Sequence, residues 1–77
     1  MNNARREKLR KLMASLERTK EEVECILEEE DEARDAMPEN LQDSDRYTAS
    51  EECSDAMSDA VSSLEEAIGY IEDAVQG

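Results

Sequence analysis

Carboxylates are the side chains of this sequence whose number and spacing could do chemistry. The chain has 77 residues, with 22 Asp and Glu, nine Lys and Arg and no His, so its formal net charge is −13. Dense carboxylates can hold a cation, transfer protons or attract a positively charged surface. They are densest in the middle of the chain, where we consider twelve as candidate partner-binding residues: Glu28, Glu29, Glu30, Asp31, Glu32, Asp35, Glu39, Asp43, Asp45, Glu51, Glu52 and Asp55.

A calcium-binding loop is the metal motif that comes closest to these residues. Asp43, Asp45 and Glu51 superficially resemble EF-hand ligands. However, the glycine of the sixth position is missing, and Ser54 stands where the twelfth position needs a glutamate. The acids at helical spacing around Glu28 could collect magnesium or calcium only as loose counter-ions. We therefore predict no metal site and no cofactor.

Catalytic chemistry is not supported by the residue types. The chain has no His, no glycine-rich phosphate loop and no base partner for its Ser residues. Clustered Glu residues could in principle do acid–base chemistry, but that requires a pocket that shifts their pKa values, and a helical hairpin offers none. We do not expect an enzyme.

Hydrophobic periodicity predicts a first long helix over about residues 4–36. Asn2 or Asn3 can cap its start, and Pro38 sets its end because the residue before a proline is pushed out of the helical region. Leu9 is assigned to heptad position a. The stripe at a and d then comprises Leu9, Leu12, Leu16, Thr19, Val23, Ile26, Glu30, Ala33 and Met37, with Met13 and Leu27 at e.

A second helix is predicted over about residues 46–76, after a turn at 37–45. Thr48 followed by Glu51 fits a capping box, whereas Ser44 could cap an earlier start, so this helix begins between 44 and 49. Its stripe comprises Cys53, Met57, Ala60, Leu64, Ala67, Ile71 and Ala74 at a and d, with Met57 at a, and Val61, Ile68 and Val75 at e. Such a short connection returns the chain antiparallel to itself.

The expected fold is thus a single all-α domain over residues 1–77, an antiparallel two-helix hairpin. A core of this size is marginal, and there is no Phe or Trp to fill it. Each a/d/e stripe is wider than one neighbouring helix can cover. Dimerisation into a four-helix bundle would cover the remainder, and so would a different protein; we favour the dimer, although composition does not separate the two.

Charge is distributed unevenly along the chain. Residues 1–20 hold seven Arg and Lys against two acids, a balance of +5, while the rest holds two Arg against twenty acids, a balance of −18. In the hairpin, opposite charges meet toward the chain termini, where Arg6, Arg10 and Lys11 come level with Glu72 and Asp73 and Arg18 comes level with Glu65. Acids of both helices crowd together near the turn. Acids at the end of the first helix also oppose its macrodipole. Either this region meets a basic partner or it is a solvated face, and both alternatives remain open.

The same charge argues against two classes of partner. Phosphate attraction dominates nucleic-acid binding, so a chain at −13 is not expected to bind nucleic acid or an anionic membrane directly. No run approaches the roughly 20 apolar residues of a membrane span, and we expect a cytoplasmic protein. Cys25 and Cys53 form only one possible pair, and since Cys25 falls on the outer side of its helix we expect reduced thiols.

The turn carries the one distinctive motif. Residues 37–47, MPENLQDSDRY, leading into SSLEEAI at 62–68, resemble small acidic helical proteins of phages and prophages. That group includes inhibitors of host defence such as anti-CRISPR proteins, several of which resemble nucleic acid in charge. The resemblance implies a phage-encoded protein acting in the host cytoplasm and assigns no role to an individual residue.

Three hypotheses about function follow. The one we favour is an acidic inhibitor that occupies a basic nucleic-acid-binding surface of a host defence protein, such as a CRISPR effector, by nucleic-acid mimicry. The second is a structural or assembly hairpin acting through homodimerisation. The third is an antitoxin-like partner whose apolar stripe folds against a toxin. The first depends on the acids, and the other two depend on the apolar stripes.

Overall fold

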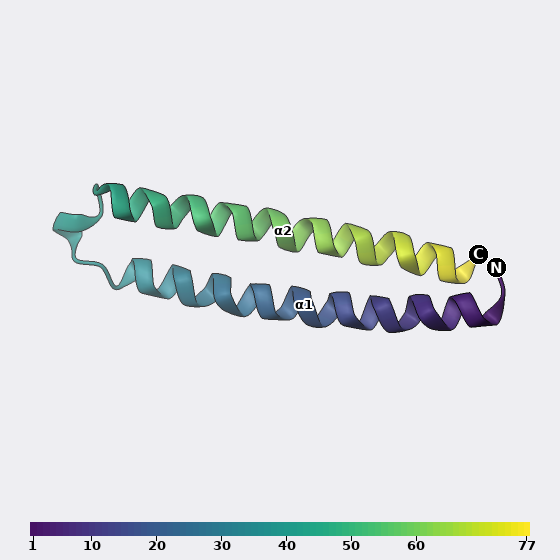
Figure 1. The fold of residues 1–77 in the computed structure, drawn as a ribbon. Coiled ribbons are helices and arrows are strands. Elements are labelled where there is room, and N and C mark those ends of the chain that lie inside the picture. Colours follow the sequence, from purple (N-terminus) through teal and green to yellow (C-terminus); the bar gives the residue numbers. More distant parts are fainter.

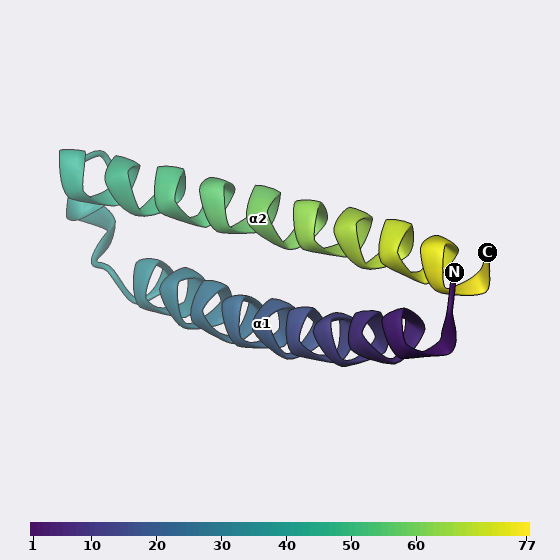
Figure 2. The same cartoon turned by 45° about the vertical axis from the view of Figure 1, so that its right-hand side comes forward.

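The computed structural model describes residues 1–77 and shows two long antiparallel helices joined at one end (Figure 1). Helix α1 spans Asn3–Asp35, a short 3₁₀ helix η1 spans Glu39–Leu41, and α2 spans Asp45–Gln76. Both chain termini lie at the end opposite the turn (Figure 2). The Cα atoms extend over 60 × 14 × 12 Å. The predicted all-α hairpin is therefore confirmed, with helix bounds within one residue of those expected.

Side-chain caps fix where each helix begins. The Asn2 side chain accepts a hydrogen bond from the Arg5 backbone N–H at 2.9 Å. Ser44 Oγ accepts one from the Tyr47 backbone N–H at 3.2 Å. Each bond satisfies a backbone donor that has no partner within the helix. Ser44, and not Thr48, is thus the cap of α2, which selects the earlier of the two predicted starts.

The connection is more ordered than the sequence predicts, because it contains η1. Helix α1 ends three residues before Pro38, as expected from the backbone restriction that a proline imposes. The Ser44 hydroxyl donates to the Leu41 carbonyl at 2.6 Å, and the Gln42 side-chain amide donates to the Met37 carbonyl at 3.5 Å. These bonds make a compact turn between the two helices.

The line of contact between α1 and α2 is only half-buried. Ser54, at 7% exposure, is the one buried residue, and no hydrophobic residue is buried. The half-buried apolar residues within the two helices fall mainly at heptad positions a and e. They are Leu9, Met13, Leu16, Val23 and Leu27 of α1, and Tyr47, Met57, Val61, Leu64, Ala67, Ile68, Ile71 and Val75 of α2.

The predicted stripe at positions a and d is wrong at d. Leu12 is 57% exposed and Ile26 is 54% exposed, and Cys53, Ala60 and Ala74 are exposed as well. On α2, position e carries mainly Val and Ile whereas position d carries mainly Ala. When α2 faces α1 with position e, it therefore buries more apolar area than it would with position d. Since one neighbour covers only two adjacent positions, most of position d is left in solvent.

Charged side chains close the end that carries the termini. Arg6 donates from Nε to the Val75 carbonyl at 3.2 Å and from Nη2 to the carbonyl of the last residue at 3.5 Å. A cation is favoured there because the last carbonyls of a helix lack partners and form the negative end of its dipole. Near the middle of the hairpin, Glu65 pairs with Lys20 at 3.8 Å, because Lys20 is at position e and faces α2; Arg18, which we expected to lie level with Glu65, is exposed.

Neither helix contains a stretch apolar enough to span a membrane. Cys25 and Cys53 are both exposed and form no disulfide.

Leu27→Asp should destabilise the hairpin. Leu27 is at position e in the line of contact, so a carboxylate there would be partly desolvated, and we expect a loss of about 2 kcal/mol or more. Cys25→Asp is the matched control: it adds the same charge to the same turn of α1 at an exposed site and should change stability by about 0.5 kcal/mol or less. Urea unfolding followed by circular dichroism measures both. Equal stability of the two variants would contradict a line of contact at positions a and e.

Candidate partner-binding site at the turn end

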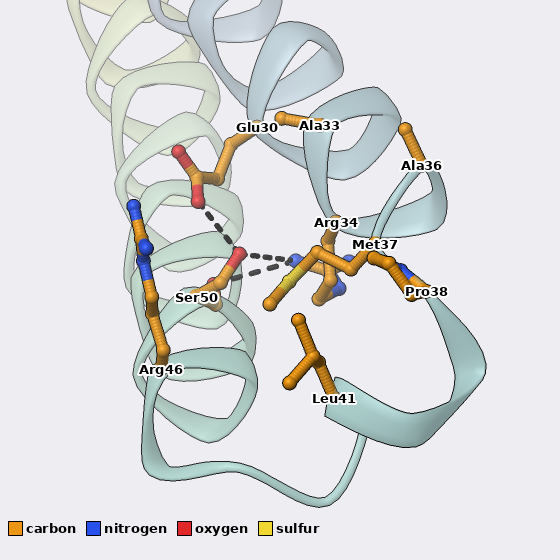
Figure 3. Close-up of a pocket in the computed structure, with 9 residues that line it drawn as sticks. All are labelled: Glu30, Ala33, Arg34, Ala36, Met37, Pro38, Leu41, Arg46 and Ser50. Atoms are coloured by element: carbon orange, nitrogen blue, oxygen red, sulfur yellow. Dashed lines mark hydrogen bonds between the residues drawn. The ribbon is translucent and has the colours of Figure 1, made fainter.

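Arg34 lies at the centre of the turn end, which we define as residues 28–55. Its side chain is 14% exposed and points between the helices (Figure 3). Nη1 donates to Ser54 Oγ at 2.7 Å and to both the carbonyl and the hydroxyl of Ser50 at 3.3 Å. Nη2 donates to Asp31 Oδ1 at 2.7 Å. One guanidinium therefore ties the last turn of α1 to the first turns of α2.

The same two serines of α2 also donate hydrogen bonds to acids of α1. Ser54 Oγ donates to Asp31 Oδ1 at 2.7 Å. Ser50 Oγ donates to Glu30 Oε2 at 2.6 Å, as Figure 3 shows. These serines stand at positions e and a of α2, which further along the helix are apolar. No buried side-chain nitrogen or oxygen lacks a hydrogen-bond partner. A satisfied polar network thus takes the place of apolar contacts at this end.

The network stabilises the charged forms of both ionisable partners. The hydrogen bond from Ser54, followed by that from Arg34, favours the carboxylate and lowers the pKa of Asp31. The bond to Asp31 in turn favours the guanidinium and raises the pKa of Arg34. Partial desolvation opposes both shifts but is outweighed. Asp31 and Arg34 therefore remain an ion pair at neutral pH.

The twelve predicted partner-binding residues fall into two groups. Glu30 and Asp31 are half-buried and accept the hydrogen bonds described above, so they hold the hairpin together. The other ten are exposed and their side chains make no hydrogen bond or ion pair within the chain. They are Glu28, Glu29, Glu32, Asp35, Glu39, Asp43, Asp45, Glu51, Glu52 and Asp55. These ten are accessible to a partner, and their role in binding one stays a prediction.

Sequence reasoning missed Arg34, Ser50 and Ser54 as functional residues of this region. A signal was present, because all three are polar residues at positions a or e, which become inward positions once the helices face each other with a and e. The predicted stripe includes Glu30, at position a, but not Arg34, Ser50 or Ser54. Four polar residues at these inward positions, Glu30, Arg34, Ser50 and Ser54, gather at the turn end, whereas Arg6 and Lys20 occupy position e elsewhere on α1.

A hollow lies beside the network, between the end of α1 and the connection (Figure 3). It is lined by Glu30, Ala33, Arg34, Ala36, Met37, Pro38, Leu41, Arg46 and Ser50. Met37 and Leu41 line it, and their side chains point toward each other (Figure 3). No group of three or more His, Cys, Asp and Glu residues is arranged to hold a metal ion. What the hollow offers is a small apolar contact next to the exposed acids.

Comparison of the chain with protein families, with curated proteins and with solved structures finds no match.

Asp31→Asn should destabilise the hairpin in a pH-dependent way. Because the pKa of Asp31 is lowered by folding, its ionised form contributes stability fully above the ordinary aspartate pKa of about 4. That contribution is lost as the pH falls through the lower pKa of the folded state. We therefore expect the variant to melt below the wild type at neutral pH and the gap to narrow at about pH 2, as followed by circular dichroism.

Glu28→Gln is the control for this measurement, because it removes the same charge from an exposed site on the same helix. It should not lower the melting temperature at neutral pH. A gap between wild type and Asp31→Asn that is equally large at both pH values would contradict a role for the ionised carboxylate.

Proposed function

We propose that this chain is an inhibitor that binds a basic nucleic-acid-binding surface of another protein through the exposed carboxylates of the turn end, and so excludes the nucleic acid. The observation that supports this proposal is the amount of negative charge per unit length of the hairpin. Charge attraction of this kind acts before contact and raises the rate of association.

The charge density near the turn is close to that of a nucleic-acid duplex. Residues 21–35 of α1 and 45–59 of α2 together carry fourteen acids and two arginines, a net charge of −12. Both segments lie side by side (Figure 1), and each is about 22 Å long at ~1.5 Å per residue. They therefore present about one net negative charge per 1.8 Å, whereas double-stranded DNA carries one per ~1.7 Å of its axis.

The structure also presents this charge in a preorganised form. The ten exposed acids are carried by two helices and a turn that is closed by hydrogen bonds, so little backbone freedom would be lost on binding. Arg34 is engaged with Asp31 inside the hairpin, which leaves Arg46 as the only exposed cation of the turn end. A basic groove would thus meet an almost purely negative surface.

The resemblance of the turn motif to phage and prophage proteins supports a target among host defence proteins. An effector that holds nucleic acid in a basic groove, such as a CRISPR effector, has the required chemistry. Pairs between exposed charges are screened by salt, so the proposed complex should weaken steeply as ionic strength rises.

Neutralising four exposed acids of the turn end should abolish capture of the target. The variant Glu28→Gln, Glu29→Gln, Glu32→Gln and Glu52→Gln leaves the Arg34 network intact, because none of these side chains takes part in it. We expect wild-type protein to capture a nucleic-acid-binding protein from bacterial lysate, identified by mass spectrometry. Duplex DNA added as a competitor should release it.

The matched control removes four acids elsewhere, with Glu17→Gln, Glu66→Gln, Glu72→Gln and Asp73→Asn. These residues are exposed, and both variants have the same net charge of −9. The control should retain the target. If both variants retain the same target, or if the wild type captures only copies of itself, the carboxylates of the turn end are not the binding surface.

A further inference from the structure

One long face of the hairpin has no neighbour, and it is apolar along α2 and mixed along α1, where Lys8, Glu22 and Glu29 lie among the apolar residues. We call it the open face, and it consists of heptad positions d and g of both helices. Its large residues are Leu12 and Ile26 of α1 and Tyr70 of α2, which is 70% exposed. The nine acids of α2 all fall at positions b, c and f, so beyond residue 46 the open face of that helix has no charge at all.

Positions d and g of the two helices lie on the same side of the hairpin. Both helices are right-handed, they run antiparallel, and each faces the other with positions a and e. Around each helix, position d lies next to position a, on the side away from position e. In two antiparallel helices that face each other with a and e, the d positions of both therefore lie on the same side of the line of contact. Ala33 and Arg46, the position d residues nearest the turn, accordingly line one hollow. The apolar residues of α1 and α2 at these positions therefore lie on one side of the hairpin.

We propose that the open face is an interface whose occupant is the open face of a second copy, the two hairpins packing head to tail as a four-helix bundle. One hairpin has no buried hydrophobic residue, so pairing would give the protein its core. The Cα atoms extend over 60 × 14 Å along this face, or about 800 Å², which is the area that a standard interface buries on each partner.

Charge selects the head-to-tail orientation. Residues 21–59 hold sixteen acids and two arginines, a net charge of −14, whereas the remainder of the chain has a net charge of +1. If the two turns lay together, the two strongly negative halves would face each other. Head to tail, each negative half faces a nearly neutral half that contains the basic start of α1. Like charges across an interface are costly, so the second arrangement is favoured.

A two-fold axis across the middle of the open face, at the level of Thr19, sets the register on α1. It places α1 antiparallel to α1 of the second copy. Leu12 then meets Ile26 of the second copy, because both are seven residues from Thr19. Lys8 meets Glu29 of the second copy in the same way, within one residue. Symmetry repeats each apolar and each ionic pair on the other side of the axis.

The same axis crosses α2 near residue 66, since Lys20 lies level with Glu65. There α2 packs antiparallel to α2 of the second copy, and Ala67 at position d lies next to the axis, where its small side chain allows the two helices to come close. On α1, Thr19 lies next to Thr19 of the second copy.

Cross-linking tests this register. The variant Cys25→Ser with Cys53→Ser and Thr19→Cys has a single thiol, which lies at the axis on the open face, so a cross-link can form only between two chains. We expect a short bismaleimide to convert this variant almost wholly into a covalent dimer at micromolar protein. Cys25→Ser with Cys53→Ser and Ser62→Cys, where the new thiol lies at exposed position f, is the control and should stay largely uncross-linked.

Charge reversal tests the orientation without altering the apolar residues. Lys8→Glu and Glu29→Lys should each raise the dimer dissociation constant about tenfold, because each change affects two symmetry-related pairs. The double variant restores opposite charges at both pairs and should return the constant to near the wild-type value. Sedimentation equilibrium measures all three, and circular dichroism confirms that each variant is helical.

A wild-type protein that is monomeric at about 100 µM, above the micromolar affinities of ordinary specific complexes, would overturn the proposal. So would cross-linking equal to that of the control, or a double charge variant no tighter than the single ones. The inference does not rest on the proposed function, because the cysteine variants change no acid of the turn end. Their failure would leave the capture experiment unaffected, and the reverse also holds.

Discussion

Two helices alone share a single line of contact, and the rest of this structure depends on that constraint. Each helix covers two adjacent heptad positions of the other, here a and e, so no hydrophobic side chain becomes fully buried. The hairpin therefore relies on directed polar bonds at its ends. Arg6 reaches the last carbonyls of α2, and Arg34 reaches the side chains and backbone of its first turns. Arginine suits both places because its fork of N–H groups serves several acceptors at once.

At the turn end the hydrogen bonds of Arg34, Ser50 and Ser54 also reduce the electrostatic repulsion between acids. Acids of both helices come together there, and those of α1 also lie at the unfavourable end of its dipole. Asp31 and Glu30 are converted from sources of repulsion into acceptors for Arg34, Ser50 and Ser54. The remaining acids point outward into solvent, where repulsion is screened. The chain can thus carry a dense negative surface without opening the hairpin.

Helix type, number and bounds could be predicted from the sequence because long periodic segments and capping residues are local signals. The face that each helix turns inward could not, since apolar residues at a, d and e do not reveal which two positions a neighbour will cover. That choice depended on the bulk of Val and Ile at position e of α2. Arg34 was missed for the same reason, because its partner Ser54 is twenty residues away and comes level only in the true register. The twelve candidate acids could be located from the sequence, and the structure shows that ten of them are exposed.

The position of Arg34 close to the turn has a consequence for how the chain folds. Its contact with Ser50 joins residues 16 apart, whereas the contact of Arg6 with Val75 joins residues 69 apart. Closing the shorter loop first costs about 1.3 kcal/mol less chain entropy. The contacts between the two helices are thus expected to form first next to the turn and then to extend toward the termini. Since like charges are most crowded next to the turn, added salt should lower the folding barrier by screening them.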